Sequence, residues 1–135
     1  MPIELREGPP VDPVQLAALF AAVGFRRDRH PAHLVAMVEG SRWVVSAWDT
    51  DGPGQPRLVG FVRAVSDGVS NAYVSTVGVL PSHQRRGIGR QLMTRLLADK
   101  PTVKWVLHTS EAGEALYRSL GFVDATRMLV RDRER

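Results

Sequence analysis

The feature that most constrains the fold of this chain is a change of hydrophobic periodicity at Gly87. Before Gly87, residues 72–80 form an apolar-rich, alternating run that is typical of a β-strand. After Gly87, apolar residues recur at helical spacing through residues 88–97, and residues 103–107 return to a strand pattern. A strand–helix–strand unit of this kind crosses over right-handed, so the two strands are expected to be parallel neighbours in one sheet.

The segment before this unit predicts an antiparallel pair of strands. Residues 58–65 form a second apolar run, and the residues between the two runs, Ser66-Asp67-Gly68, are typical of a tight turn. Two strands joined by such a turn pair antiparallel. Alternation within residues 72–80 assigns Tyr73, Val77 and Val79 to one face of the sheet and Val74 to the other.

Helix caps and breakers mark the remaining elements. Asp12 is a favourable cap before Pro13, which suits the first helical position, and Pro31 opens a second short helix. The expected strands are 3–6, 42–48, 58–65, 72–80, 103–107 and 128–130, and the expected helices are 13–23, 31–37, 88–97 and 112–120. This order predicts the α/β class, with a mixed central sheet flanked by about four helices in a single domain of residues 1–135.

Composition excludes several classes of protein. At 135 residues the chain is long enough for one core but too short for two. It has no cysteine, which excludes disulfides, thiolate metal sites and a cysteine nucleophile, and we expect no metal. Its apolar runs are too short for a membrane-spanning helix, and its first residues lack the apolar stretch of a secretory signal. We therefore expect a cytoplasmic protein with no membrane partner.

The chain is basic, with a formal net charge of +4. Its tail, residues 131–135, alternates in sign and is better explained as a solvated end than as a nucleic-acid-binding arm. Aromatic residues make up only 7% and are not interleaved with basic positions, so no nucleic-acid partner is expected. A mild positive charge suits an anionic small molecule bound at a defined site.

The segment from Gln84 to Arg90 is the candidate for such a site. It reads Gln-Arg-Arg-Gly-Ile-Gly-Arg and lies between the strand and the helix. The first amides of a helix have no partners within the helix, and the helix dipole places partial positive charge at that end. A glycine pair at a helix start also occurs as a close-packed turn, and the dinucleotide and P-loop fingerprints are absent. Spacing alone therefore leaves both interpretations open.

Two motifs give the chain a family resemblance. Gln84–Gly89 resembles the Gln/Arg-x-x-Gly-x-Gly/Ala motif of the GNAT acetyltransferase superfamily, and Val77, Val79 and Pro81 precede it as in that family. Residues 114–122, Glu-Ala-Leu-Tyr-Arg-Ser-Leu-Gly-Phe, resemble the second signature of the same family. The resemblance covers residues 58–123 and implies the GNAT fold. It also implies an N-acetyltransferase that transfers an acetyl group from acetyl-CoA to an amine acceptor.

The resemblance implies roles for particular residues. Main-chain amides of the turn would bind the CoA pyrophosphate, and the preceding strand, expected to carry a bulge, would run beside the pantetheine arm. The residues implied in binding acetyl-CoA are Val77, Gly78, Val79, Gln84, Arg85, Arg86, Gly87, Ile88, Gly89, Arg90, Ser110 and Tyr117. Ser110 stands where the family often has an asparagine. Among the catalytic groups, Tyr117 would protonate the departing thiolate, and the Val79 amide would stabilise the oxyanion.

The general base is not identified by the sequence. Many relatives place a carboxylate on the strand before the turn, whereas this chain reads Ser75-Thr76-Val77-Gly78 there. A water chain through Ser75, Thr76 or Tyr73, or direct action by His108, could carry the proton. Asp67 is better explained as a turn former, and His83 is expected to be exposed.

Two questions remain open at this stage. The missing carboxylate also fits a non-catalytic domain that binds acyl-CoA as a sensor or partner. The acceptor is not identified, although the basic residues between Val23 and Met37 (Arg26, Arg27, Arg29 and His33, beside Phe25) weakly favour an acceptor with a carboxylate or phosphate. The resemblance allows a homodimer, which is common among relatives.

Overall fold

A five-stranded sheet in the order β1-β2-β3-β4-β5 organises the chain. The computed structural model describes residues 2–25 and 30–134. The strands are β1 (Ile3–Glu7), β2 (Trp43–Asp49), β3 (Arg57–Ser66), β4 (Asn71–Val79) and β5 (Lys104–Leu107). The first four pair antiparallel, while β4 and β5 pair parallel. The mixed sheet and its parallel pair are confirmed.

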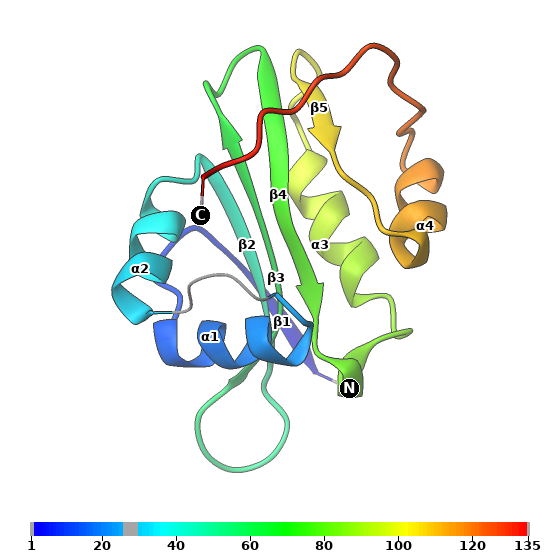
Figure 1. Cartoon of the computed structure of the whole chain (residues 1–135). Coiled ribbons are helices and arrows are strands. Elements are labelled where there is room, and N and C mark those ends of the chain that lie inside the picture. Colours follow the sequence, from blue (N-terminus) through cyan, green and yellow to red (C-terminus); the bar gives the residue numbers. More distant parts are fainter. Residues whose placement is uncertain (1, 26–29, 135) are drawn as a thin grey trace.

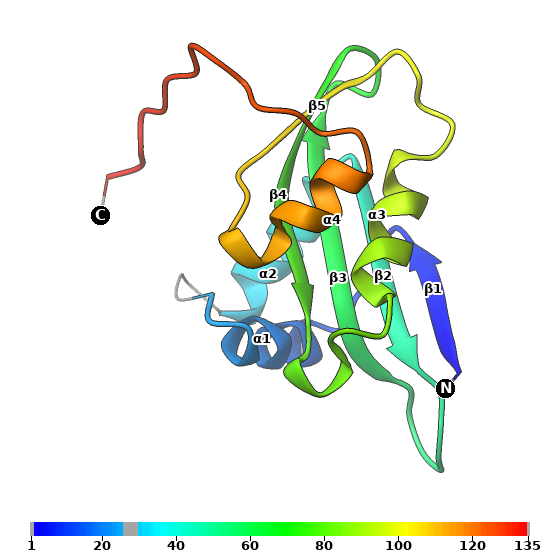
Figure 2. The same ribbon diagram turned by 90° about the vertical axis from the view of Figure 1, so that its right-hand side faces the viewer.

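Helices cover both faces of the sheet (Figures 1 and 2). They are α1 (Pro13–Ala22), α2 (Pro31–Glu39), α3 (Ile88–Leu97) and α4 (Glu114–Ser119), with short 3-10 turns η1 (Pro81–His83) and η2 (Glu111–Gly113). Figure 2 shows α1 and α2 on one side of the sheet and α3 and α4 on the other. The Asp12 carboxylate accepts a bond from the Val14 amide at 3.0 Å, which confirms the predicted cap of α1.

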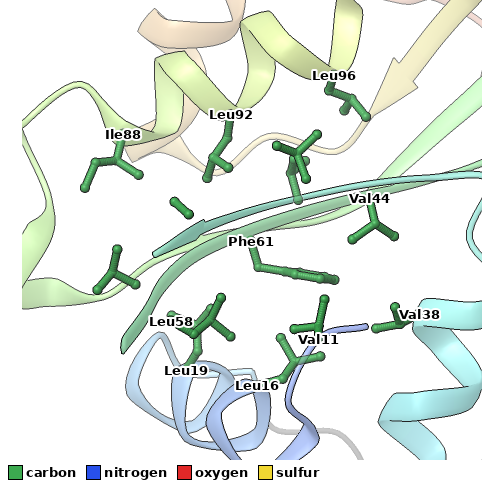
Figure 3. Packing of buried hydrophobic residues seen from close by; sticks show 14 of the residues in the cluster. Val11, Leu16, Leu19, Val38, Val44, Leu58, Phe61, Ile88, Leu92 and Leu96 are labelled. Carbon is green, nitrogen blue, oxygen red and sulfur yellow. The ribbon is translucent and has the colours of Figure 1, made fainter. Parts of the chain in front are cut away.

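Buried side chains from both helical layers meet at the sheet (Figure 3). Phe61 is fully buried and packs edge-on against Phe20 of α1, with ring centroids 6.0 Å apart. On the opposite side of β3, Leu92 of α3 is fully buried and lies against Gly60. A methyl group at Gly60 would come within 2.9 Å of Leu92 and 3.3 Å of Ala47, so glycine at residue 60 lets the helix pack this closely without displacing these side chains.

We expect Gly60→Val to destabilise the protein by about 1–3 kcal/mol, because the added methyl groups overpack a core that has no free volume there. Ala125→Val adds methyl groups at an exposed position and should change stability by less than about 0.5 kcal/mol. Urea unfolding of both variants measures the difference. Equal midpoints for the two variants would contradict the packing argument.

A β-bulge changes which residues of β4 share a face. Arg63 pairs with Thr76 but Ala64 pairs with Val74, so Ser75 is the extra residue on β4. Tyr73 therefore lies on the same face as Thr76, the face covered by α1 and α2, whereas Val79 faces α3. The predicted alternation that grouped Tyr73 with Val79 is wrong, because one inserted residue reverses the pattern.

The bulge coincides with an opening between β4 and β5. Pairing of these strands ends at Val74 and Leu107, yet β4 continues to Val79. Figure 1 shows the chain after β5 diverging from β4 toward α4. From Ser75 to Val79, the edge of β4 that faces away from β3 has no neighbouring strand among the described residues.

The predicted strand at residues 128–130 is wrong. The structure has no strand there, and the segment runs away from the sheet (Figure 2). Leu129 is 97% exposed, so its side chain packs against nothing. Three apolar residues offer few ladder hydrogen bonds, and without a buried face these do not offset the entropy lost on ordering the segment.

Candidate active site

The turn between β4 and α3 presents unpartnered amides. Gly87 has φ of +81°, which a glycine adopts without strain, and it serves as the N-cap of α3. The first hydrogen bond of α3 runs from the Gln91 amide to the Gly87 carbonyl at 3.0 Å. The amides of Ile88, Gly89 and Arg90 precede it and therefore have no partner within the helix. Together with the dipole of α3, they form a site suited to a phosphate group.

The backbone of Val79 faces the opening between β4 and β5. The Leu80 amide donates to the Val59 carbonyl at 2.8 Å, so the backbone of Leu80 points to β3. Backbone groups alternate along an antiparallel strand, so those of Val79 and Val77 point the other way. The Gln84 side chain reaches this edge and donates to the Val79 carbonyl at 3.0 Å. Gln84 thus links the turn to the end of β4 and holds the two in position.

Three elements meet around Gly89. A methyl group at this residue would lie 3.6 Å from Leu116 of α4 and 3.9 Å from Val79 of β4. The two sequence motifs, separated by about twenty residues, are therefore neighbours in space. Arg85 and Arg86 are exposed at the same turn, and Arg90 donates to the Ser119 hydroxyl at 2.9 Å, which links α3 to α4. The structure thus brings together the predicted turn residues, Val79 and the Tyr117 helix.

Tyr117 is half-buried on α4. Its ring packs edge-on against Phe122, with centroids 6.1 Å apart, and lies over Gly113, where a methyl group would come within 2.8 Å of the ring. Burial raises the pKa of the Tyr117 hydroxyl, so the group stays protonated well above neutral pH. No group among the described residues hydrogen-bonds to this hydroxyl, which leaves its proton available to a ligand.

Ser110 caps the 3-10 turn that precedes α4. Its hydroxyl oxygen accepts a bond from the Gly113 amide at 3.2 Å. The hydroxyl proton has no acceptor among the described residues and can be donated to a ligand. The predicted pantetheine contact remains a prediction.

The candidate bases lie far from the Val79 amide. His108 is exposed one residue after β5, level with Ser75, and about 13 Å of strand separates that position from Val79. Its ring packs against Tyr73, with centroids 6.0 Å apart. Asp67 accepts bonds from the amides of Val69 and Ser70 within the β3–β4 turn, about 26 Å from Val79 along β4. Asp67 is therefore a turn former.

The prediction that His83 is exposed is wrong. His83 is buried, and its ring bonds to the Ser82 hydroxyl at 2.7 Å and to the Asp49 carboxylate at 2.9 Å. The bond from His83, followed by that from the Asp51 amide, lowers the pKa of Asp49. Hydrogen bonds among Ser82, His83 and Asp49 thus join the start of the β4–α3 turn to the end of β2.

The lowered pKa of Asp49 predicts a specific loss of stability in acid. Its folded-state pKa lies below its unfolded value, so its contribution is fully present above the unfolded pKa and is lost as pH falls through the folded one. We expect Asp49→Asn to flatten the decline of Tm between about pH 5 and pH 2. Asp51→Asn removes a nearby carboxylate that does not bond to His83 and is the matched control. An Asp49→Asn profile parallel to wild type would contradict this role.

Sequence analysis missed Arg63, which the structure places beside the bulge. Its Nε donates to Thr76 Oγ1 at 3.0 Å, its Nη2 to Ser75 Oγ at 3.0 Å and its Nη1 to Ser41 Oγ at 3.3 Å. All three hydroxyl oxygens therefore accept hydrogen bonds from Arg63. The available signal was a single charge in the otherwise apolar strand Leu-Val-Gly-Phe-Val-Arg-Ala-Val.

The fold and the neighbouring positions of the two motifs fit the family that these motifs resemble, and comparison with known families confirms that family. The family described as acetyltransferase (GNAT) domain matches residues 39–124. The chain therefore belongs to the GNAT acetyltransferase family.

Individual relatives agree with this assignment. The chain is 41% identical to serotonin N-acetyltransferase 2, chloroplastic, of Oryza sativa subsp. japonica, over 79% of this chain and 54% of the relative. It is 37% identical to GCN5-related N-acetyltransferase 1, chloroplastic, of Arabidopsis thaliana, over 81% and 55%. A GNAT family structure from Streptococcus pneumoniae TIGR4 superposes with a TM-score of 0.73 at 30% identity, covering 98% of this chain and 99% of that one.

The chain spans about half the length of the curated relatives that it matches. Both plant relatives are named chloroplastic, so the predicted cytoplasmic location is not confirmed. In the described part of the chain, the helices are too short and too polar to cross a membrane.

Proposed function

We propose that this chain transfers an acetyl group from acetyl-CoA to a primary amine of a small molecule or peptide, by direct attack within a ternary complex. The observation that carries the proposal is the meeting of three groups around Gly89. These are the unpartnered amides that begin α3, the Val79 backbone at the open edge of β4 and the Tyr117 helix. Family membership and the names of the curated relatives support the same reaction.

The turn and the open strand edge would hold the donor. The amides of Ile88, Gly89 and Arg90 would bind the CoA pyrophosphate, and Arg85 and Arg86 would add full positive charge beside it. The pantetheine arm carries amides of its own, which suit the free edge of β4 from Val77 to Val79. This arrangement would place the thioester in the opening between β4 and β5.

The Val79 amide and Tyr117 would act on the reacting atoms. The acceptor nitrogen attacks the thioester carbonyl carbon, and the negative charge that develops on the carbonyl oxygen would be stabilised by the Val79 N–H. The carbon–sulfur bond then breaks as the carbonyl re-forms, and the phenolic proton of Tyr117 would pass to the departing thiolate. Holding both substrates in one geometry supplies a large part of the acceleration without an enzyme nucleophile.

The proton lost by the amine needs an acceptor. We propose that water carries it along the α1/α2 face toward His108, which the Tyr73 ring holds at the end of β5. The strand distance from Val79 favours a relay through water over direct transfer to His108.

Release of free CoA from acetyl-CoA tests the proposal. The acceptor panel should include arylalkylamines, polyamines, amino acids and peptide N-termini. Turnover with any of them supports the enzyme. Saturable binding of acetyl-CoA without turnover would favour the alternative, a non-catalytic acyl-CoA sensor. Absence of acetyl-CoA binding would refute the proposed donor site.

We also infer that residues 1–135 form one domain that acts in the cytoplasm. Limited proteolysis tests the first point and subcellular fractionation the second. Light scattering on the purified protein would distinguish a monomer from a homodimer.

A further inference from the structure

Arg63 is a half-buried cation without an acidic partner among the described residues. Its three protein contacts are all neutral hydroxyl oxygens, those of Thr76, Ser75 and Ser41. None of the ion pairs between described residues includes it. A guanidinium has five N–H donors, so two remain without a protein partner there.

The protein offsets the charge of Arg63 only in part. Ser41 follows α2, and its hydroxyl donates to the Met37 carbonyl at 2.6 Å, so the negative end of the helix dipole lies near the guanidinium. That dipole amounts to about half a unit charge, which leaves a net positive site. Burial lowers the pKa of Arg63, and Arg133 adds a further cation in the same region. If Arg63 only linked β3 to β4 and α2, a neutral hydrogen-bond donor would suffice there.

The position of Arg63 relates it to the proposed reaction centre. It lies on the face of the sheet that carries α1 and α2, at the margin of the helical layer, where Val65 and Tyr73 are 48% and 41% exposed. The opening between β4 and β5 begins at Ser75, whose hydroxyl Arg63 binds.

We infer that Arg63 binds the carboxylate of the acceptor, so that this chain acetylates amines that carry a carboxylate at the far end of an apolar chain. The inference rests on the proposed acetyl transfer and names the substrate class of that site. The two remaining N–H donors match a carboxylate, which accepts paired bonds from arginine. Between Thr76 and Val79, the apolar side chains of Val23 and Phe25 lie beside Gly78 on this face, and they would contact the methylene groups between the two ends.

The strand geometry predicts the length of such an acceptor. Thr76 and Val79 are three residues apart, or about 10 Å along β4, and Arg63 bonds to Thr76. A carboxylate at Arg63 and an amine beside the thioester at Val79 would lie about 6–10 Å apart, allowing for one hydrogen bond at each end. A chain of five or six carbons spans this distance, whereas an α-amino acid does not.

A series of acceptors of increasing length tests both the charge and the length that the proposed site requires. Glycine, 4-aminobutanoate and 6-aminohexanoate would be compared with the corresponding primary amides. These amides have nearly the same shape but carry no negative charge at the carboxyl end. We expect kcat/KM for 6-aminohexanoate to exceed that for its amide by about 10- to 100-fold, the range expected for a charge-assisted bond. The preference should be smallest for glycine. Equal values for 6-aminohexanoate and its amide would overturn the inference.

Arginine variants test the assignment to this residue. Arg63→Gln should remove most of the acid-over-amide ratio, Arg63→Lys should retain part of it, and Arg63→Glu should shift preference toward 1,5-diaminopentane. Arg95→Gln removes an arginine that pairs with Glu7 on the outer surface and should leave the ratio unchanged. Thermal melts show which variants fold. A ratio that survives in folded Arg63→Gln would overturn the assignment.

Binding experiments separate this inference from the proposed reaction. NMR shift perturbation with 6-aminohexanoate and its amide, in the presence of free CoA, measures acceptor affinity without turnover. If no amine is acetylated, the proposed function fails. If acid and amide bind equally well, the Arg63 inference fails while acetyl transfer can stand.

Discussion

Gly89→Glu is expected to weaken acetyl-CoA binding by at least about 100-fold while leaving the fold intact. Residue 89 is among the first residues of α3, where its amide precedes the first helical hydrogen bond. A carboxylate there would oppose the pyrophosphate at close range, in a partly dehydrated site where repulsion is weakly screened. The same carboxylate favours the positive end of the helix dipole and replaces a flexible glycine, so stability should not fall. Calorimetric titration with acetyl-CoA measures the loss.

Gly89→Gln is the matched control for this variant. It adds a side chain of the same length without charge, and its Cβ would meet Leu116 and Val79 at ordinary contact distances of 3.6 and 3.9 Å. Binding that is weaker in Gly89→Glu than in Gly89→Gln isolates the electrostatic part. Equal losses would mean that volume alone excludes the ligand, and unchanged binding by both would place the pyrophosphate elsewhere.

Tyr117→Phe is expected to lower kcat by about 100-fold and to change the Kd of acetyl-CoA by only a few fold. Phenylalanine keeps the ring that packs against Phe122 and over Gly113, so α4 should hold its position. The variant removes only the proton that the hydroxyl would give to the thiolate. Stopped-flow measurement of acetyl transfer, combined with equilibrium binding of acetyl-CoA, separates the two effects.

The pH dependence of wild type gives a second readout for Tyr117. Because burial raises the pKa of its hydroxyl, the donor form persists through neutral pH and into the alkaline range. Any alkaline decline in kcat that arises from ionisation of Tyr117 should therefore lie above the usual pKa range of tyrosine and should disappear in Tyr117→Phe. Equal reduction of kcat and acetyl-CoA affinity would instead assign Tyr117 to donor binding.

Local signals predicted the turn between β4 and α3 well. The change of periodicity at Gly87 located the β4–α3 turn, where the structure has a left-handed glycine. These features depend on residues within one turn of each other, so a sequence pattern can indicate them. The two motifs were also placed correctly in order, although their contact at Gly89 became visible only in the fold.

Features that depend on distant partners were not predictable in this way. The bulge at Ser75 is defined by register against β3, and alternation within β4 alone gave the wrong face for Tyr73. Burial of His83 depends on Asp49, which lies 34 positions earlier. The surroundings of Arg63 are set by hydroxyls on β4 and after α2, which are distant from it in the sequence. The strand expected at 128–130 failed because an apolar run indicates only the capacity to pair, not the presence of a partner.

The bulge at Ser75 separates two tasks that a single strand performs. Beyond it, β4 would present main-chain groups to the proposed donor, and these are the same whatever side chains the strand carries. Beside it, the Arg63 side chain of β3, bonded to Thr76 of β4, would bind the proposed acceptor. A substitution at Arg63 should therefore alter which amine is accepted without touching the groups proposed to hold acetyl-CoA. Such a division allows acceptor preference to diverge during evolution while the donor chemistry is retained.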